Sequence, residues 1–184
     1  MKKMRAVIAS VLAVATLFSF TGCSNFKVID DEDVFFDALD EAVGIDEDET
    51  QHHKNTKVNG DKAEYVINAK DGDNSYIYVR FDDDDDAMDY FDDMYEDFDE
   101  IFAEKQFKGS HAMSQSKTRG YITFDGEIEY GSKIGKKYVS SDTEIFGGIY
   151  VNKNVYIEVY SLNGSKRDKE KITSFLKALG FPKP

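Results

Sequence analysis

The sequence predicts a single α+β domain, a two-layer sandwich in which an antiparallel sheet of about six strands has its helices packed on one face. Three observations lead to this fold class. Segments with one apolar stripe at helical spacing alternate with paired runs of alternating polarity, in the order α-ββ-α-ββ-ββ-α. Each stripe and each alternating run has one apolar side, which must be buried against another element. The length of 184 residues fits one hydrophobic core.

The first 23 residues have the features of an export signal. Met1–Arg5 contains three basic residues, the run Ala6–Phe20 is apolar apart from three hydroxyl residues, and Thr21-Gly22 precedes Cys23. A basic start, a short apolar core and a small-residue cleavage site are typical of a secretory signal. The apolar run is short for a segment that spans a membrane permanently.

This leader resembles the lipobox of bacterial lipoproteins, in which the cysteine thiol is diacylated and the peptide bond before the cysteine is cut. Those lipoproteins usually have leucine three residues before the cysteine, where this chain has Phe20. The resemblance covers residues 1–23 and implies a signal peptide of residues 1–22, cleavage between Gly22 and Cys23, and a lipid anchor on Cys23. The mature protein would then lie on the extracytoplasmic face of the cell membrane, because two acyl chains anchor stably. The alternative is an ordinary cysteine next to a membrane helix.

The folded part is predicted to begin after a short polar tether. Residues 23–33 form this lipidated tether, extended by repulsion among its acidic residues, and residues 34–184 form the domain. Apolar residues at helical spacing predict a helix over residues 33–43, which Gly44 would end. The polar and aperiodic stretch 45–61 is expected to be a loop.

A β-hairpin and the longest helix follow. Residues 65–69 and 77–81 alternate in polarity across the turn-forming stretch 70–74, which predicts a hairpin. Residues 84–105 have an apolar stripe wide enough to lie on a sheet, while the opposite side is almost wholly Asp and Glu. Residues 107–118 are expected to be another polar connection.

Two further hairpins are predicted in the second half of the chain. Asp125-Gly126, inside the alternating stretch 121–130, is the strongest short hairpin signal in the sequence. A third hairpin pairs residues 145–151 with residues 155–162. Gly147-Gly148 in its first strand indicates a bulge or a close approach of two backbones.

The last helix begins after Ser165, which forms a capping-box pattern with Asp168, and ends at Gly180. Residues 63–104 and 144–179 each have the pattern of a hairpin followed by a helix. This similarity indicates an internal repeat.

Composition and charge restrict the partners. Cys23 is the one cysteine of the chain, which excludes disulfides, thiolate catalysis and cysteine-bound metals from the mature domain. The net charge is −13, and residues 30–50 and 82–104 contain many acids and no base, whereas bases outnumber acids after residue 105. Phosphates would be repelled by such a chain, so nucleic acid is not expected as a partner. Solubility alone would also explain the charge.

Tyrosines provide the candidate binding face. They alternate with apolar residues in two predicted strands and would form one exposed surface if those strands adjoin. The candidate residues are Tyr76, Tyr78, Arg80, Tyr156 and Tyr160. Aromatic rings with hydroxyl tips suit an envelope protein or a glycan as ligand, although the chain has no tryptophan. The alternative is that tyrosine simply favours strands.

A calcium site is the one cofactor that the sequence suggests. Oxygen ligands at alternate positions followed by a later carboxylate form the pattern of an EF-hand loop, here Asp82, Asp84, Asp86 and Asp93. Ala87 stands where that loop requires glycine, and a helix is predicted to begin inside it. The alternative is that the acids lie where the helix dipole favours them.

No catalytic residue is predicted. Adjacent His52-His53 and distant His111 lack the spacing of zinc ligands. We therefore expect a surface lipoprotein with a non-catalytic binding domain in the cell envelope. The alternative is a secreted hydrolase that uses paired carboxylates to cleave envelope polymers, and a third hypothesis is an acidic module that buffers cations.

Overall fold

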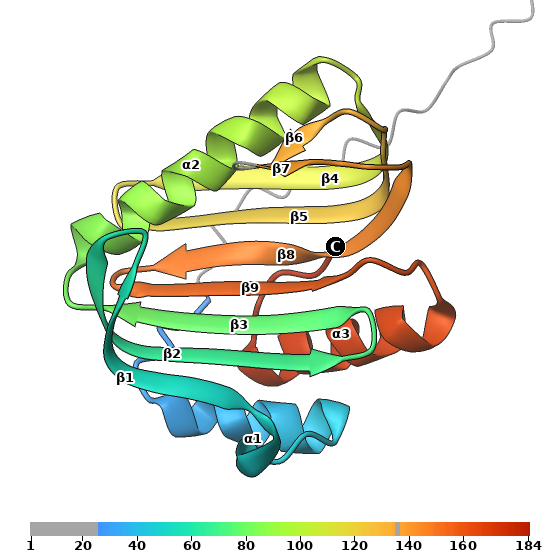
Figure 1. Cartoon of the computed structure of the whole chain (residues 1–184). Helices are drawn as coiled ribbons and strands as arrows, with labels where there is room; N and C mark the ends of the chain where they lie inside the picture. Colours follow the sequence, from blue (N-terminus) through green and yellow to red (C-terminus); the bar gives the residue numbers. More distant parts are fainter. Residues whose placement is uncertain (1–25, 135–136) are drawn as a thin grey trace, which may run out of the picture.

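A computed structural model describes residues 26–134 and 137–184 of the chain. The predicted signal peptide, the cleavage site at Gly22 and the lipid attachment site at Cys23 lie outside the described residues. The fold class is confirmed, because the described residues form a seven-stranded antiparallel sheet with three α-helices (Figure 1). The sheet order is β1-β2-β3-β9-β8-β5-β4.

The strands of this sheet are β1 (Gln51–Val58), β2 (Asp61–Asp71), β3 (Asn74–Phe81), β4 (Phe107–Ser116), β5 (Arg119–Ile128), β8 (Thr143–Asn152) and β9 (Val155–Ser161). The helices are α1 (Glu32–Val43), α2 (Asp84–Ala103) and α3 (Lys166–Leu179), with a short 3₁₀ helix η1 (Glu47–Glu49). A separate small hairpin pairs β6 (Lys133–Ile134) with β7 (Lys137–Tyr138). None of the helices in the described part of the chain is both long and apolar enough to span a membrane.

The three predicted helices are confirmed, with the expected ends. The side chain of Asp83 accepts a hydrogen bond from the backbone N–H of Asp86 and caps α2, and Ser165 caps α3 through the N–H of Asp168 in the same way. Gly180 ends α3 in the left-handed conformation, which costs glycine little.

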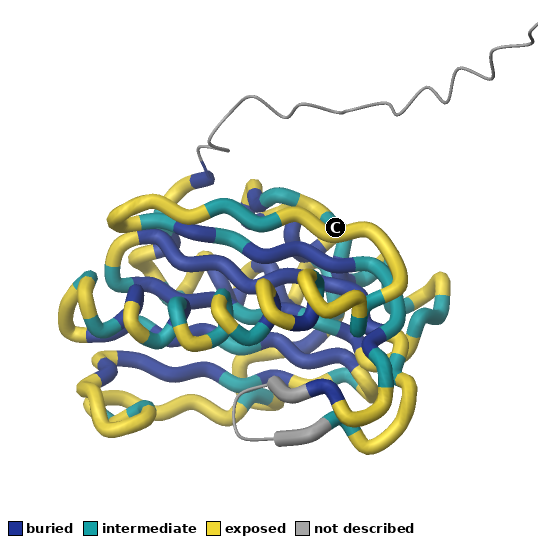
Figure 2. The backbone as a smooth tube through the Cα atoms, turned by 90° about the horizontal axis from the view of Figure 1, so that it is seen from above, coloured by how far each residue is buried: buried dark blue, intermediate teal, exposed yellow. Residues whose placement is uncertain are grey.

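The helices cover both faces of the sheet, where the sequence predicted one face. α1 and α3 pack on the face that includes Tyr76 and Tyr78, and α2 packs on the face that includes Val79 and Phe81. We call these the α1/α3 face and the α2 face. β3 has apolar side chains on both sides, as strands buried on two faces do. Figure 2 shows the resulting layers, in which the central strands are buried and the outer sides of the helices are exposed.

Strand β4 occupies the stretch 107–118 that was predicted as a polar connection, and β5 runs straight through Asp125-Gly126. The predicted hairpin at this dipeptide is therefore wrong. Gly126 lies opposite Gly109 of β4, and a Cβ atom built on Gly126 would lie 2.3 Å from the carbonyl oxygen of Lys108. The glycine is thus required by a close approach of two backbones, not by a turn.

The predicted loop 45–61 contains edge strand β1. This strand pairs with β2 through most of its length, from Gln51 opposite Asn68 to Val58 opposite Asp61. Its side chains are mostly exposed on both sides. No polarity alternation marks it, because most of its side chains are exposed and few of them, such as His52 on Tyr65 and Val58, pack against the rest of the domain.

The hairpin of β8 and β9 is confirmed, and Gly147 has the expected close contact. Its φ is +153°, and a Cβ atom there would lie 2.1 Å from the carbonyl oxygen of Val159. Both hairpin-helix units of the suggested repeat exist, β2-β3-α2 and β8-β9-α3. Their helices lie on opposite faces, so the two units are not equivalent in the fold.

The chain before α1 belongs to the domain, where the sequence predicted a free tether up to residue 33. Phe26 and Ile29 are 3% and 6% exposed and pack into the core of the α1/α3 face. The side-chain amide of Asn152 donates to the carbonyl oxygen of Phe26 at 2.8 Å, and the Tyr78 hydroxyl donates to that of Ile29 at 2.9 Å. The folded domain therefore begins by residue 26.

Candidate functional site

The predicted tyrosine face does not exist as a surface. Tyr76 and Tyr78 lie on the α1/α3 face, whereas Tyr156 lies opposite Val79 on the α2 face. Tyr76, Tyr78 and Tyr156 have no exposed surface, and Tyr160 is partly buried. The strands adjoin as the prediction required, but the antiparallel register places Tyr78 opposite Ile157, so the two tyrosine pairs point to opposite sides.

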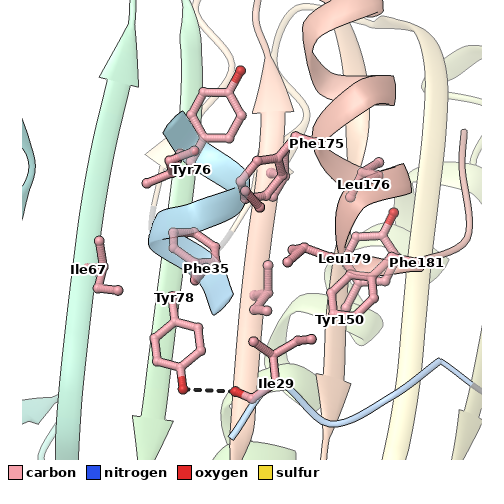
Figure 3. Close-up of a cluster of buried hydrophobic side chains, with 14 of the residues drawn as sticks. Ile29, Phe35, Ile67, Tyr76, Tyr78, Tyr150, Phe175, Leu176, Leu179 and Phe181 are labelled. Carbon is pink, nitrogen blue, oxygen red and sulfur yellow. Dashed lines mark hydrogen bonds between the residues drawn. The ribbon is translucent and has the colours of Figure 1, made fainter. Parts of the chain in front are cut away.

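These tyrosines and Arg80 have structural contacts instead. Figure 3 shows Tyr76 and Tyr78 among the side chains that α1 and α3 bury, with Tyr78 bonded to Ile29. The Arg80 guanidinium donates to the Asp30 carbonyl oxygen at 2.5 Å and to the Glu32 carboxylate at 2.7 Å. Arg80 thus links the start of α1 to β3, and its charge is paired with the Glu32 carboxylate.

Among the described residues, an acidic depression beside α2 is a candidate site. It lies between the first half of α2 and the β1–β2 turn, and its volume is about 490 Å³. Its lining residues are Asn59, Asp61, Asp89, Tyr90, Asp92 and Asp93. Helical spacing explains the convergence, because residues four apart, such as Asp89 and Asp93, lie on the same side of a helix.

The carboxylates that line this depression repel one another. The pKa of Asp92 is raised by partial burial and by the neighbouring charges of Asp89, Glu96 and Asp93, while a hydrogen bond from Gln115 opposes the rise. A raised carboxyl pKa means that the site disfavours further negative charge. A cation placed there would relieve this repulsion.

Tyr90 connects the depression to a buried polar pair on β9. Its ring lies edge-on to Tyr156, with 4.7 Å between the ring centroids, and the Tyr156 hydroxyl donates to the Glu158 carboxylate at 2.9 Å. Burial raises the pKa of Glu158, and the hydrogen bond from Tyr156 partly offsets this. A carboxyl group is therefore held under α2 in surroundings that favour its neutral form.

We expect Glu158→Gln to stabilise the protein at pH 7 by about 1 kcal/mol. The pKa is raised in the folded state, so ionisation costs folding free energy as the pH rises above the ordinary carboxyl value of 4.5. Near pH 3 the group is protonated in both states, and the two proteins should be equally stable. Urea unfolding at both pH values measures this difference. Glu100→Gln, on the exposed side of α2, is the control, and equal gains in both variants would contradict the expectation.

The four carboxylates of the predicted calcium loop are not brought together around one point. Asp84 and Asp86 lie in the first turn of α2, and Asp83 caps the helix. Asp93 is seven residues beyond Asp86, about 10 Å along the helix, whereas calcium ligands lie within about 2.6 Å of one ion. Among the described residues, no group of three or more His, Asp or Glu side chains is placed to hold a metal ion.

Two of the three histidines, His52 and His111, are in contact with aromatic rings. His111 stacks on Phe102 with 3.8 Å between the ring centroids, and burial lowers its pKa. His52 stacks on Tyr65. The three histidines therefore lie in two separate places, on β1 and β4 at opposite edges of the sheet.

Sequence reasoning missed Asn59, Asp61, Tyr90, Asp92 and Glu158. The helical pattern of residues 84–105 placed Asp92 on the acidic side of the helix, but it did not distinguish Asp92 from the other acids there. The β1–β2 turn was assigned to a loop, so its contribution to a site could not be foreseen.

Comparisons with protein-family models, with curated proteins and with solved structures gave no match to this chain.

Proposed function

We propose that this chain is a lipid-anchored protein of the bacterial cell envelope whose domain is a non-catalytic binding module. The anchor is the lipid predicted on Cys23, and the binding site is the acidic depression beside α2. The observation that carries the proposal is the crowding of carboxylates there, where Asp92 has a raised pKa. The ligand that suits this site is a cationic group, such as a lysine side chain of an envelope protein or peptide.

The distribution of charge supports a cationic ligand. α2 contains only acidic charges, and its exposed side extends the depression. Because charges more than about 8 Å apart are screened at physiological salt, the residues that line the depression matter most. Binding should tighten as the pH rises through the raised pKa of Asp92, since the carboxylate form attracts a cation and the protonated form does not.

A tetralysine peptide is the probe for this site. We expect the double variant Asp89→Asn/Asp93→Asn to bind it about tenfold more weakly in calorimetry at physiological salt. Asp37→Asn/Asp40→Asn, on the exposed side of α1, changes the net charge equally and is the matched control. It should bind as the unaltered protein does. Equal weakening in both double variants would show that the peptide responds to overall charge and would overturn the proposed site.

The alternative of a carboxylate hydrolase has one supporting observation. Such enzymes place a protonated acid near an ionised carboxylate, and Asp92, with its raised pKa, lines the depression together with Asp89. Release of reducing ends from purified cell wall by the unaltered protein, and not by Asp92→Asn, would replace the binding function with this one. Binding of tetralysine without such release supports the module.

A further inference from the structure

The two edges of the sheet differ in how they are protected. β1 and β4 are the outermost strands, and among the described residues no strand pairs with the outer side of either. An outer strand leaves alternate N–H and C=O groups without a backbone partner, and proteins usually guard such an edge with a bulge, lysines or proline. In β1, Asn55 has a φ of +50° and is skipped in the pairing with β2, and Lys54 and Lys57 lie on either side of it. β1 is therefore a guarded edge.

β4 has none of these protections over most of its length. Every residue from Phe107 to Ser116 has a partner in β5, so no bulge interrupts the strand. Residues 109–116 contain neither proline nor a charged side chain, and most of them are exposed. Eight residues of a strand span about 27 Å. A regular, uncharged edge of this length is suited to pair with another extended chain.

One flank of α2 follows this edge. The Gln115 side chain donates to the Asp92 carboxylate near one end of β4. Further along the strand, the Phe102 ring stacks on His111, with 3.8 Å between the ring centroids. These two contacts place the stretch of α2 from Asp92 to Phe102 beside β4, and residues seven apart, such as Asp92 and Asp99, lie on the same side of a helix. α2 has no basic residue. We call the acids of this flank the acidic row: Asp92, Glu96 and Asp99.

Basic residues lie beyond the ends of the uncharged stretch. Lys105 and Lys108 precede it, and Lys117 follows it in the β4–β5 turn. The Lys108 ammonium group lies 2.8 Å from the Glu129 carboxylate, so its charge is already paired. Burial lowers the pKa of His111, so this ring is neutral at pH 7. Along residues 109–116, the charge that a bound chain would meet on the α2 side therefore comes from the acidic row.

We propose that β4 is the acceptor for an extended cationic peptide, which pairs with it as an eighth strand and points alternate lysine side chains at the acidic row. This inference rests on the proposed function, because it describes how the same cationic ligand binds. Asp92 belongs both to the acidic row and to the acidic depression, so the peptide leads from one to the other. Neighbouring strands lie about 4.8 Å apart, and alternate side chains of a strand share one face. A lysine side chain with its four-carbon stem is long enough to reach back to the row from there.

Charge favours a cationic peptide over a second copy of this chain. If two β4 strands paired in the antiparallel manner, the two α2 helices would lie on the same face of the joined sheet. Their acidic rows would then face each other across the new pair of strands and repel. A lysine-containing peptide has the opposite charge and is attracted to the same row.

Two peptides of the same composition test this binding mode. Lys-Thr-Lys-Thr-Lys-Thr-Lys has all its lysines on one face when it is extended, whereas Lys-Lys-Lys-Lys-Thr-Thr-Thr divides them between two faces. We expect the alternating peptide to bind about tenfold more tightly in calorimetry at physiological salt. Glu96→Gln/Asp99→Asn should remove this preference, and the matched control Asp37→Asn/Asp40→Asn on α1 should keep it. Equal affinities of the two peptides for the unaltered protein would overturn strand addition.

Amide hydrogen exchange reports where the peptide lies. Pairing with an eighth strand gives partners to the N–H groups on the outer side of β4, which exchange more readily without it. With the alternating peptide bound, we expect alternate amides within residues 109–116 to exchange several-fold more slowly, while the amides of β1 do not change. Unchanged exchange in β4 would overturn the inference. A dimer of the peptide-free protein in sedimentation, with those amides already protected, would also overturn it, because a second copy would then occupy the edge.

Failure of strand addition gives a different result from failure of the proposed function. If Asp89→Asn/Asp93→Asn weakens the binding of tetralysine but the two seven-residue peptides bind equally, the acidic depression binds cations and β4 has no part in it. If Asp89→Asn/Asp93→Asn binds tetralysine as the unaltered protein does, the proposed site itself is wrong.

Discussion

Replacing Cys23 with serine should abolish fatty-acid attachment and leave the precursor uncut. The serine hydroxyl cannot form the thioether through which a lipoprotein is diacylated, and the chain has no other cysteine to substitute for it. The peptidase that the lipobox resemblance implies acts after acylation, so all 184 residues should remain. Metabolic labelling with an alkyne fatty acid, followed by the intact mass of the protein, measures both effects.

A displaced cysteine provides the control for this experiment. Cys23→Ser/Lys27→Cys keeps one thiol in the chain and places it after Asn25-Phe26, which is not a pair of small residues. Neither label nor cleavage should return in this variant. Fatty-acid label that persists on the Cys23→Ser protein would contradict the anchor, and with it the cell-envelope location that the proposed function requires.

Gly126→Ala should destabilise the domain by about 3 kcal/mol. The added Cβ atom would lie 2.3 Å from the Lys108 carbonyl oxygen and 2.7 Å from the Gly109 Cα atom. Both are backbone atoms, so they can move apart only if the pairing of β4 with β5 is disturbed. Urea unfolding with unchanged m-value measures the loss.

Gly72→Ala is the matched control for this substitution. Gly72 has φ of +61° in the β2–β3 turn, with open space around it, so alanine there should cost about 1 kcal/mol for its backbone conformation alone. If Gly126 lay in a hairpin turn, as the sequence predicted, replacing it with alanine would also cost only about 1 kcal/mol. If Gly126→Ala were no more harmful than Gly72→Ala, β5 would not be the continuous strand described above.

Asp125-Gly126 shows how far local sequence determines the fold. The same dipeptide suits a tight turn and a close crossing of two strands, because both need a residue without a side chain. Gly109, which lies opposite Gly126 in β4, decides between them. That partner is 17 positions away in a stretch without polarity alternation, so local pattern could not reveal it. Helix ends were predictable because their signals, such as Ser165 and Gly180, are local.

The tyrosines illustrate a second limit. Alternation in β3 correctly separates Tyr76 and Tyr78 from Val79 and Phe81, but it does not say whether one or both sides are buried. Tyrosine was assigned to the solvent side because more apolar residues occupy the other side of each strand. A buried tyrosine hydroxyl needs a hydrogen-bond partner. Tyr78 finds that partner in the Ile29 carbonyl group, 49 positions away. The acidic depression could not be predicted for the same reason, because α2 and the β1–β2 turn are brought together only by tertiary packing.

The pairing of β3 with β9 has a consequence for how the molecule is made. Tyr78 and Ile157 lie opposite each other at the centre of the sheet, so its two halves join through residues far apart in the chain. High contact order of this kind slows folding, because the ends of a long loop must find each other first. A polypeptide threaded through a secretion channel from its amino end would emerge with its first half unable to close. If the chain is exported as proposed, the edge of β3 stays unpaired until β9 has crossed, and an unpaired strand edge favours aggregation.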